Sequence, residues 1–205
     1  MTERERPRVL VVCTGNVCRS PLIERALTHA VGARIEVESA GTAALVGSPM
    51  EGRAAAQLQA WRMEPAGFVA RQLVRDMVAR ADLVLTATRA HRGAVATLHP
   101  AALAYTFTLS DFSELVSAAS PPGPPASAER SSLPALVRLA AAQRGMSRPR
   151  PAVETDLVDP YRRSDATFRQ MARQVSRILP PVIYALSAAV ATSAEIPRRM
   201  LRGVP

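Results

Sequence analysis

Lysine is absent from this sequence of 205 residues, and all 26 basic side chains are arginine. Aspartate and glutamate together number 17, so the formal net charge is +9 at neutral pH. A strongly basic protein raises the hypothesis of a nucleic-acid or other anionic partner. The arginines are scattered from Arg4 to Arg202 without a dense basic block. This spread favours a solvated basic surface and disfavours nucleic-acid binding.

Cysteine is almost absent, since Cys13 and Cys18 are its two occurrences. Two cysteines so close together cannot build a disulfide framework, which favours a reducing cytoplasm. Long apolar runs are also lacking. The early run VLVV is shorter than the core of a signal peptide, and the stretch from Ile178 is interrupted by two prolines and falls short of the ~20 residues that cross a membrane. We therefore expect a cytoplasmic protein without a membrane partner.

Metal and nucleotide patterns are missing as well. His29, His91 and His99 do not have the spacing of metal ligands, and no Gly-rich nucleotide-binding pattern is present. We expect no metal and no cofactor.

Strand and helix patterns alternate along the first half of the chain. Short strands are predicted at 8–13, 33–41, 82–88 and 102–109, and helical segments lie between them. This order is typical of an α/β fold with a mainly parallel sheet and helices on both faces. In the helix that follows the first strand, Ser20 is expected at the N-cap and Pro21 at the first helical position.

The composition changes after Ser110. Residues 113–153 form a Pro-rich insertion in which 133–145 have the composition of a short helix, and a helical pattern resumes at 164–179. A buried helix with a kinked start is expected from Ile178. The basic tail spans 194–205. We expect one domain over 1–205 that contains this insertion.

The stretch VLVVCTGNVCRSP, residues 9–21, joins an apolar strand to a short loop and a helix. Backbone N–H groups of such a loop and helix converge and bind anions. Cys13 stands at the end of the strand in this positive field, which favours a thiolate able to attack phosphorus. Arg19 can hold two phosphate oxygens with its planar guanidinium.

Other residues of the loop fit the same chemistry. Gly15 permits the torsions of a tight loop, and Asn16 tolerates the left-handed region and can tie the loop by side-chain hydrogen bonds. Ser20 can cap the helix, donate to the thiolate, or both. Because arginine is so frequent, a cysteine and an arginine at this spacing mean little alone. The whole string of strand, loop and helix residues is what specifically indicates a phosphate site. The alternative interpretation of the two cysteines is an inert buried pair.

The string VVCTGNVCRSP resembles the phosphate-binding motif of the low-molecular-weight protein tyrosine phosphatases. Further matching pieces follow in the family's order: SAGT at 39–42, GSP at 47–49, ARQL at 70–73, ADLVLTAT at 81–88 and DPYRRSDATF from Asp159. The resemblance covers about residues 8–110 and 157–190. It implies a four-stranded parallel sheet with a flavodoxin-like strand order and a site at the switch point.

The resemblance also implies an activity: metal-free hydrolysis of phosphotyrosine proteins through a phosphocysteine. Asp159 would protonate the leaving group and then activate water. From the residues alone, Asp111, Asp156 and Asp165 stay open as the acid. The implied partners are a phosphorylated protein and, in the site, phosphate or another oxyanion. The implied substrate-binding residues are Thr14, Gly15, Asn16, Val17, Cys18, Ser20 and Tyr161.

Two of these residues have further implied roles. Tyr161 would wall the pocket and stack on an aromatic leaving group, the alternative being a ring that faces the core. Cys18 would form a reversible disulfide with Cys13 that protects the thiol from over-oxidation, the alternative being a small buried side chain.

Alternatives from the same fold stay open. A protein arginine phosphatase has Thr where this chain has Val17. A thioredoxin-coupled arsenate reductase needs further cysteines, although a glutathione-type or mycothiol-type partner could replace them. A binding module that keeps the loop without catalysis is the non-enzymatic alternative. Two departures from the family affect substrate recognition: Arg162 stands where many eukaryotic relatives have a second Tyr, and the insertion directly precedes the acid loop.

Overall fold

The computed structural model describes residues 6–119, 132–146 and 150–190, and the basic tail at 194–205 lies outside these ranges. Within them, four strands form one parallel sheet: β1 (Arg8–Cys13), β2 (Glu36–Gly41), β3 (Leu83–Thr86) and β4 (Thr106–Thr108). The strand order is β2-β1-β3-β4, so the flavodoxin-like order is confirmed. Ligands bind such sheets at the carboxyl ends of the strands beside the switch in order, which is where β1 ends at Cys13.

The central strand β1 is apolar because both of its faces are covered. Val9 and Val11 pack into one hydrophobic cluster, whereas Leu10 and Val12 pack into the cluster on the opposite face. This alternation is the two-residue period of a strand. Burial on both sides holds the end of β1, and therefore Cys13, in a rigid position.

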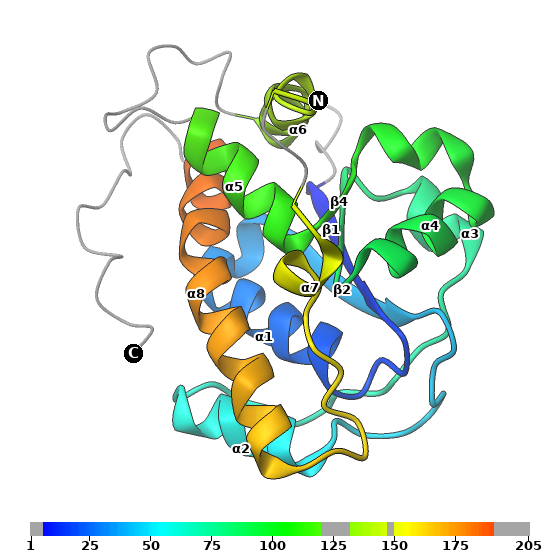
Figure 1. Ribbon diagram of the computed structural model, residues 1–205, viewed down its shortest axis with the longest axis vertical. Helices are drawn as coiled ribbons and strands as arrows, with labels where there is room; N and C mark the ends of the chain where they lie inside the picture. The colour runs from blue at the N-terminus through cyan, green and yellow to red at the C-terminus, as the bar shows by residue number, and fades with distance from the viewer. Residues whose placement is uncertain (1–5, 120–131, 147–149, 191–205) are drawn as a thin grey trace.

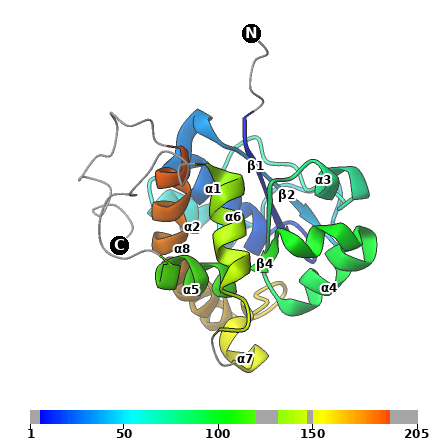
Figure 2. The ribbon, with the colours of Figure 1, turned by 90° about the horizontal axis from the view of Figure 1, so that it is seen from above.

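Helices cover the two faces of the sheet (Figures 1 and 2). One layer contains α1 (Arg19–Val31), α5 (Leu109–Ala119) and α8 (Asp165–Val190), with α2 (Gly52–Ala60) packed beside α1. The opposite layer contains α3 (Arg75–Ala79), α4 (Arg89–Leu98) and the short 3-10 helix η2 (Pro100–Ala104). A second 3-10 turn, η1 (Gly32–Arg34), links α1 to β2.

The segment predicted as a Pro-rich insertion, 113–153, includes helical residues. Residues 113–119 continue α5, α6 spans Leu133–Ala142 and α7 spans Ala152–Thr155. Helix α6 buries Leu133, Val137 and Ala140 and contacts both α5 and α8. Residues 120–131 and 147–149 of the insertion lie outside the described part of the chain. Helix α6 thus extends the helical layer beside α5 and α8, and α7 leads into the segment that carries Asp159.

Helix α8 runs without a break from Asp165 to Val190 and contains Pro180 and Pro181. The residues from Ile178 are therefore helical, as expected, but they continue α8 and do not begin a helix of their own. Pro180 is exposed and Pro181 is half-buried, while Leu179 and Val182 beside them are buried. Packing of these apolar neighbours outweighs the cost of the missing N–H groups.

Candidate active site

The loop after β1 is held from outside by the segment that follows β2. The carbonyl of Cys13 accepts from the Thr42 N–H, and the carbonyls of Thr14 and Gly15 accept from later N–H groups of the same segment at 3.0 Å. The segment after β2 thus engages three successive carbonyls of the loop and leaves its N–H groups available for a ligand. Such a set of N–H groups is suited to an anion.

Gly41 allows the close contact between these two segments. It pairs with Cys13 in the register of β1 and β2. A Cβ atom at this position would lie 2.3 Å from the Thr14 carbonyl oxygen and 3.0 Å from Ala44. Glycine is therefore required here, which gives the SAGT piece of the sequence a physical role in shaping the loop.

Asn16 fixes the loop from inside. Its φ of 53° lies in the left-handed region, and its fully buried side chain donates to the hydroxyls of Ser20 and Ser39, each at 2.8 Å. Its amide oxygen accepts from the Arg71 N–H at 2.8 Å. The expectation that Asn16 tolerates this conformation and ties the loop is confirmed. Asn16 supports the pocket from behind and is not part of its lining.

Ser20 faces Cys13. Its Oγ lies 2.9 Å from Cys13 Sγ and accepts from Asn16, so its own proton is free to donate to the sulfur. The expectation of Ser20 as the N-cap is wrong, because α1 begins at Arg19 and Cys18 is the N-cap residue. Ser20 lies inside the first turn, where its hydroxyl reaches Cys13 rather than the backbone.

A half-buried carboxyl group, that of Glu24, ends this series of hydrogen bonds. Ser39 accepts from Asn16 and donates to Glu24 Oε2 at 2.5 Å. Burial raises the pKa of the Glu24 carboxyl above its ordinary value. Hydrogen bonds thus connect Glu24 to Cys13 through Ser39, Asn16 and Ser20. Each donor in this series has a defined direction.

The two cysteines differ in their surroundings. Both are buried and free. Burial, followed by the negative charge of Glu51, raises the pKa of Cys18 to about 12. Cys18 therefore stays a protonated thiol at neutral pH, whereas Cys13 has the donor Ser20 beside it.

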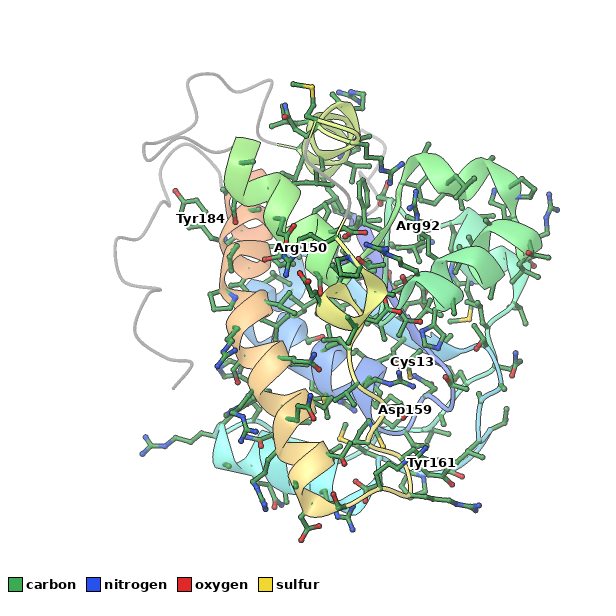
Figure 3. All side chains as sticks on the ribbon, viewed as in Figure 1. Cys13, Arg92, Arg150, Asp159, Tyr161 and Tyr184 are labelled. Carbon is green, nitrogen blue, oxygen red and sulfur yellow. The ribbon has the colours of Figure 1, made fainter. Side chains whose placement is uncertain are left out.

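Arg19 and Asp159 meet at the pocket. Arg19 Nη2 donates to Asp159 Oδ2 at 2.7 Å and to Thr14 Oγ1 at 3.2 Å. Its Nη1 donates to the Leu157 carbonyl at 3.5 Å. The Tyr161 N–H donates to the other carboxylate oxygen of Asp159 at 3.1 Å. Figure 3 shows Asp159 beside Cys13, with Tyr161 further along the same segment.

The other candidate acids lie elsewhere. Asp156 accepts from the Arg89 N–H at the start of α4, Asp165 pairs with Arg53, and Asp111 lies in the first turn of α5. None of the three lines the pocket at Cys13. Of the four aspartates left open by the sequence, Asp159 is the one that the fold brings to this pocket.

The pocket has a volume of about 110 Å³, with a buried floor and an open rim. Cys13 is 2% exposed, whereas Tyr161 is 36% exposed. The ring of Tyr161 is therefore at the rim and not in the core. The lining residues are Cys13, Thr14, Gly15, Val17, Cys18, Arg19, Ala43, Leu45, Asp159 and Tyr161.

His91 is a neighbour of the pocket that sequence reasoning missed. It is 7% exposed, and its Nε2 lies 2.8 Å from Thr14 Oγ1 while its Nδ1 lies 2.7 Å from Thr88 Oγ1. Burial, and then the charge of Arg19, lowers its pKa to about 4. The available signal was topological, since Thr88 and His91 follow β3, the strand next to β1 in the sheet.

The described ranges hold no group of three or more His, Cys, Asp or Glu residues that could bind a metal ion. None of their helices has the length and apolar character needed to span a membrane.

The comparison with known proteins agrees with this geometry. The family model for low molecular weight phosphotyrosine protein phosphatase matches residues 8–123. The chain belongs to this family. Members of the low molecular weight phosphotyrosine protein phosphatases are enzymes, so the chain is a protein tyrosine phosphatase.

Individual relatives support the assignment to the phosphatase family. The protein named "Probable low molecular weight protein-tyrosine-phosphatase EpsP" of Ralstonia nicotianae is 33% identical over 106 residues, which cover 52% of this chain and 72% of that protein. The low molecular weight protein-tyrosine-phosphatase Wzb of Escherichia coli K12 is 40% identical over 83 residues, or 40% of this chain and 56% of Wzb.

Solved structures of phosphatases share the fold. The tyrosine phosphatase AmsI of Erwinia amylovora has a TM-score of 0.62 at 22% identity, covering 94% of this chain and 98% of that one. The YwlE arginine phosphatase of Geobacillus stearothermophilus has a TM-score of 0.64 at 24% identity, covering 88% and 92%.

Proposed function

We propose that this phosphatase cleaves protein phosphotyrosine with Cys13 as the nucleophile, Arg19 as the group that holds the phosphoryl oxygens, and Asp159 as the proton donor. The observation that carries the proposal is that these three residues line one pocket, although Asp159 lies 140 positions beyond Arg19.

The reaction has two steps. In the first, Cys13 Sγ bonds to phosphorus, the bond from phosphorus to the tyrosyl oxygen breaks, and Asp159 gives that oxygen a proton. In the second, the Asp159 carboxylate takes a proton from water, the water oxygen bonds to phosphorus, and the S–P bond breaks to release phosphate. Arg19 and the loop N–H groups stabilise the equatorial oxygens in both steps.

The pocket walls support an aromatic leaving group. Val17, Leu45 and Tyr161 are apolar or aromatic lining residues, which suit a phenyl ring. A phosphorylated guanidino group brings N–H donors that need acceptors, and Val17 offers none from its side chain. The free thiol nucleophile also fits a reducing compartment, and we propose a cytoplasmic location.

A comparison of two phosphopeptides tests this substrate class. We expect the wild-type enzyme to have a higher kcat/KM for a phosphotyrosine peptide than for the matched phosphoarginine peptide. Val17→Thr is expected to narrow this preference, because the added hydroxyl can accept from the guanidino N–H. A wild type that prefers phosphoarginine would reverse the proposal in favour of an arginine phosphatase. Thiol oxidation that depends on arsenate and on glutathione or mycothiol would favour an arsenate reductase.

A further inference from the structure

We propose that His91 is a positioning residue that holds the Thr14 hydroxyl with its proton directed into the pocket, where it donates to a phosphoryl oxygen. Thr14 thereby becomes an additional contact to the bound group, beside Arg19 and the loop N–H groups. The inference rests on the proposed function, since a phosphoryl group must enter this pocket.

The imidazole of His91 is held on both sides. Thr88, the N-cap of α4, accepts from the His91 backbone N–H at 3.3 Å. The Thr88 hydroxyl also meets Nδ1 at 2.7 Å, and Nε2 meets Thr14 Oγ1 at 2.8 Å. With a partner at each ring nitrogen, the ring has one orientation, and α4 fixes its distance from the loop.

The charge state of His91 determines which groups donate. A buried imidazole whose pKa is about 4 is neutral at pH 7 and has one N–H and one accepting nitrogen. When the Thr88 hydroxyl donates to Nδ1, the proton of the ring is on Nε2 and is donated to Thr14 Oγ1. That oxygen also accepts from Arg19 Nη2 at 3.2 Å. With both acceptor positions filled, the hydroxyl proton of Thr14 must turn elsewhere.

The remaining direction for this proton is the pocket. Thr14 lines it together with Cys13 and Arg19. In the other tautomer, Thr14 donates to Nε2 and offers nothing to the pocket. A phosphoryl oxygen carries negative charge and is a stronger acceptor than a neutral imidazole. A bound phosphoryl group therefore selects the tautomer with hydrogen on Nε2.

A double-mutant cycle separates this role from plain support of the fold. Thr14→Val removes the hydroxyl at constant shape, and His91→Phe keeps a buried ring without nitrogens. Each is expected to lower kcat/KM for 4-nitrophenyl phosphate roughly 10- to 100-fold, the effect of losing one hydrogen bond to a charged group. The double variant is expected to be no slower than Thr14→Val, because His91 acts through Thr14.

Conservative variants complete the test. Thr14→Ser keeps the hydroxyl, and His91→Gln places an amide N–H near the position of Nε2. Both are expected to have most of the kcat/KM that Thr14→Val and His91→Phe lose. His29→Gln, an exposed histidine on α1, is the control and is expected to match wild type. The proposal would be overturned if the losses in kcat/KM of Thr14→Val and His91→Phe multiplied in the double variant. It would also be overturned if Thr14→Val had the wild-type kcat/KM.

The affinity for inorganic phosphate, measured by calorimetry, tests the Thr14 contact without relying on catalytic turnover. Thr14→Val is expected to bind phosphate more weakly than wild type and Thr14→Ser, whether or not His91→Phe folds. Equal phosphate affinity in wild type and Thr14→Val would overturn the role of Thr14. A wild type that binds phosphate but does not hydrolyse aryl phosphates would overturn the proposed function alone.

Discussion

Arg19 donates a hydrogen bond of 2.7 Å to the carboxylate of Asp159, which comes from a segment 140 residues later in the chain. The side chain of Arg19 is 4% exposed and that of Asp159 is 50% exposed. The pair therefore connects the buried floor of the pocket to its open rim. In the proposed reaction, a phosphoryl group on the floor lies against the guanidinium, and its leaving group lies within reach of the carboxyl.

The shape of the guanidinium leads to the first prediction. Arg19→Lys keeps the positive charge but loses the planar pair of donors that fits two phosphoryl oxygens. We expect kcat/KM for an aryl phosphate to fall roughly 10²- to 10³-fold, the effect of losing one stabilising donor of the transition state. Arg53→Lys is the matched control, because Arg53 pairs with Asp165 outside the pocket. A rate for Arg19→Lys within tenfold of wild type would argue against this role.

Gly41 provides a test of the loop geometry. In Gly41→Ala the new Cβ meets the Thr14 carbonyl and the backbone of Ala44, and neither can move without moving the loop. We expect the free energy of unfolding to fall by about 1 to 3 kcal/mol. The rate of aryl phosphate hydrolysis by the folded variant is also expected to fall, because the loop that holds the phosphoryl group is displaced. Urea denaturation and steady-state kinetics measure the two effects.

Gly52→Ala is the control for that substitution. Gly52 is the first residue of α2, and a Cβ there meets nothing within 4 Å. Because alanine favours a helix, stability is expected to stay equal or rise slightly, with an unchanged rate. Equal behaviour of the two alanine variants would contradict the contact between Gly41 and the loop.

His91 predicts how stability depends on pH. Its pKa is about 4 in the folded protein against an ordinary value of 6.5, so the unfolded chain binds more protons between these values. Stability therefore falls as the pH drops through this window. Burial and Arg19 cause the shift, and Asp159 opposes it.

The comparison with His91→Gln isolates this effect. From pH 7 to pH 5, wild type is expected to lose about 2 kcal/mol more unfolding free energy than the variant. Glu24 also titrates with a shifted pKa, but it is present in both proteins and cancels. Parallel pH curves for the two proteins would show that His91 is not held neutral by its surroundings.

Local sequence patterns were sufficient for the parts of the site that lie in one short segment. The apolar run of β1 places Cys13 at the end of a buried strand, and the left-handed φ of Asn16 follows from its residue type. The position of Ser20 was harder to predict. As a helix N-cap its hydroxyl bonds the backbone, whereas here Asn16 and Cys13 are its partners.

The rest of the site depends on which strands are neighbours. His91 and Thr14 meet because β3 lies beside β1, and this contact joins residues 77 positions apart. Asp159 reaches the pocket because the segment after α7 bonds to the residue that follows β3, where the Leu157 N–H donates to the Ala87 carbonyl. Neither contact has a local pattern. The residues alone left four aspartates open, and the resemblance to the family singled out Asp159.

Attack by Cys13 on phosphorus is the central claim, and trapping of the phosphocysteine tests it most directly. Asp159→Asn is mixed with 2,4-dinitrophenyl phosphate, whose leaving group needs no proton, and is denatured within the first turnover. The S–P bond should then form at speed and break slowly, because the carboxylate that activates water is missing. We expect a burst of one dinitrophenolate per chain, with one phosphoryl group on the peptide that carries Cys13 and none in Cys13→Ser. A phosphoryl group on another residue, or a Cys13→Ser protein that still turns over, would contradict the account.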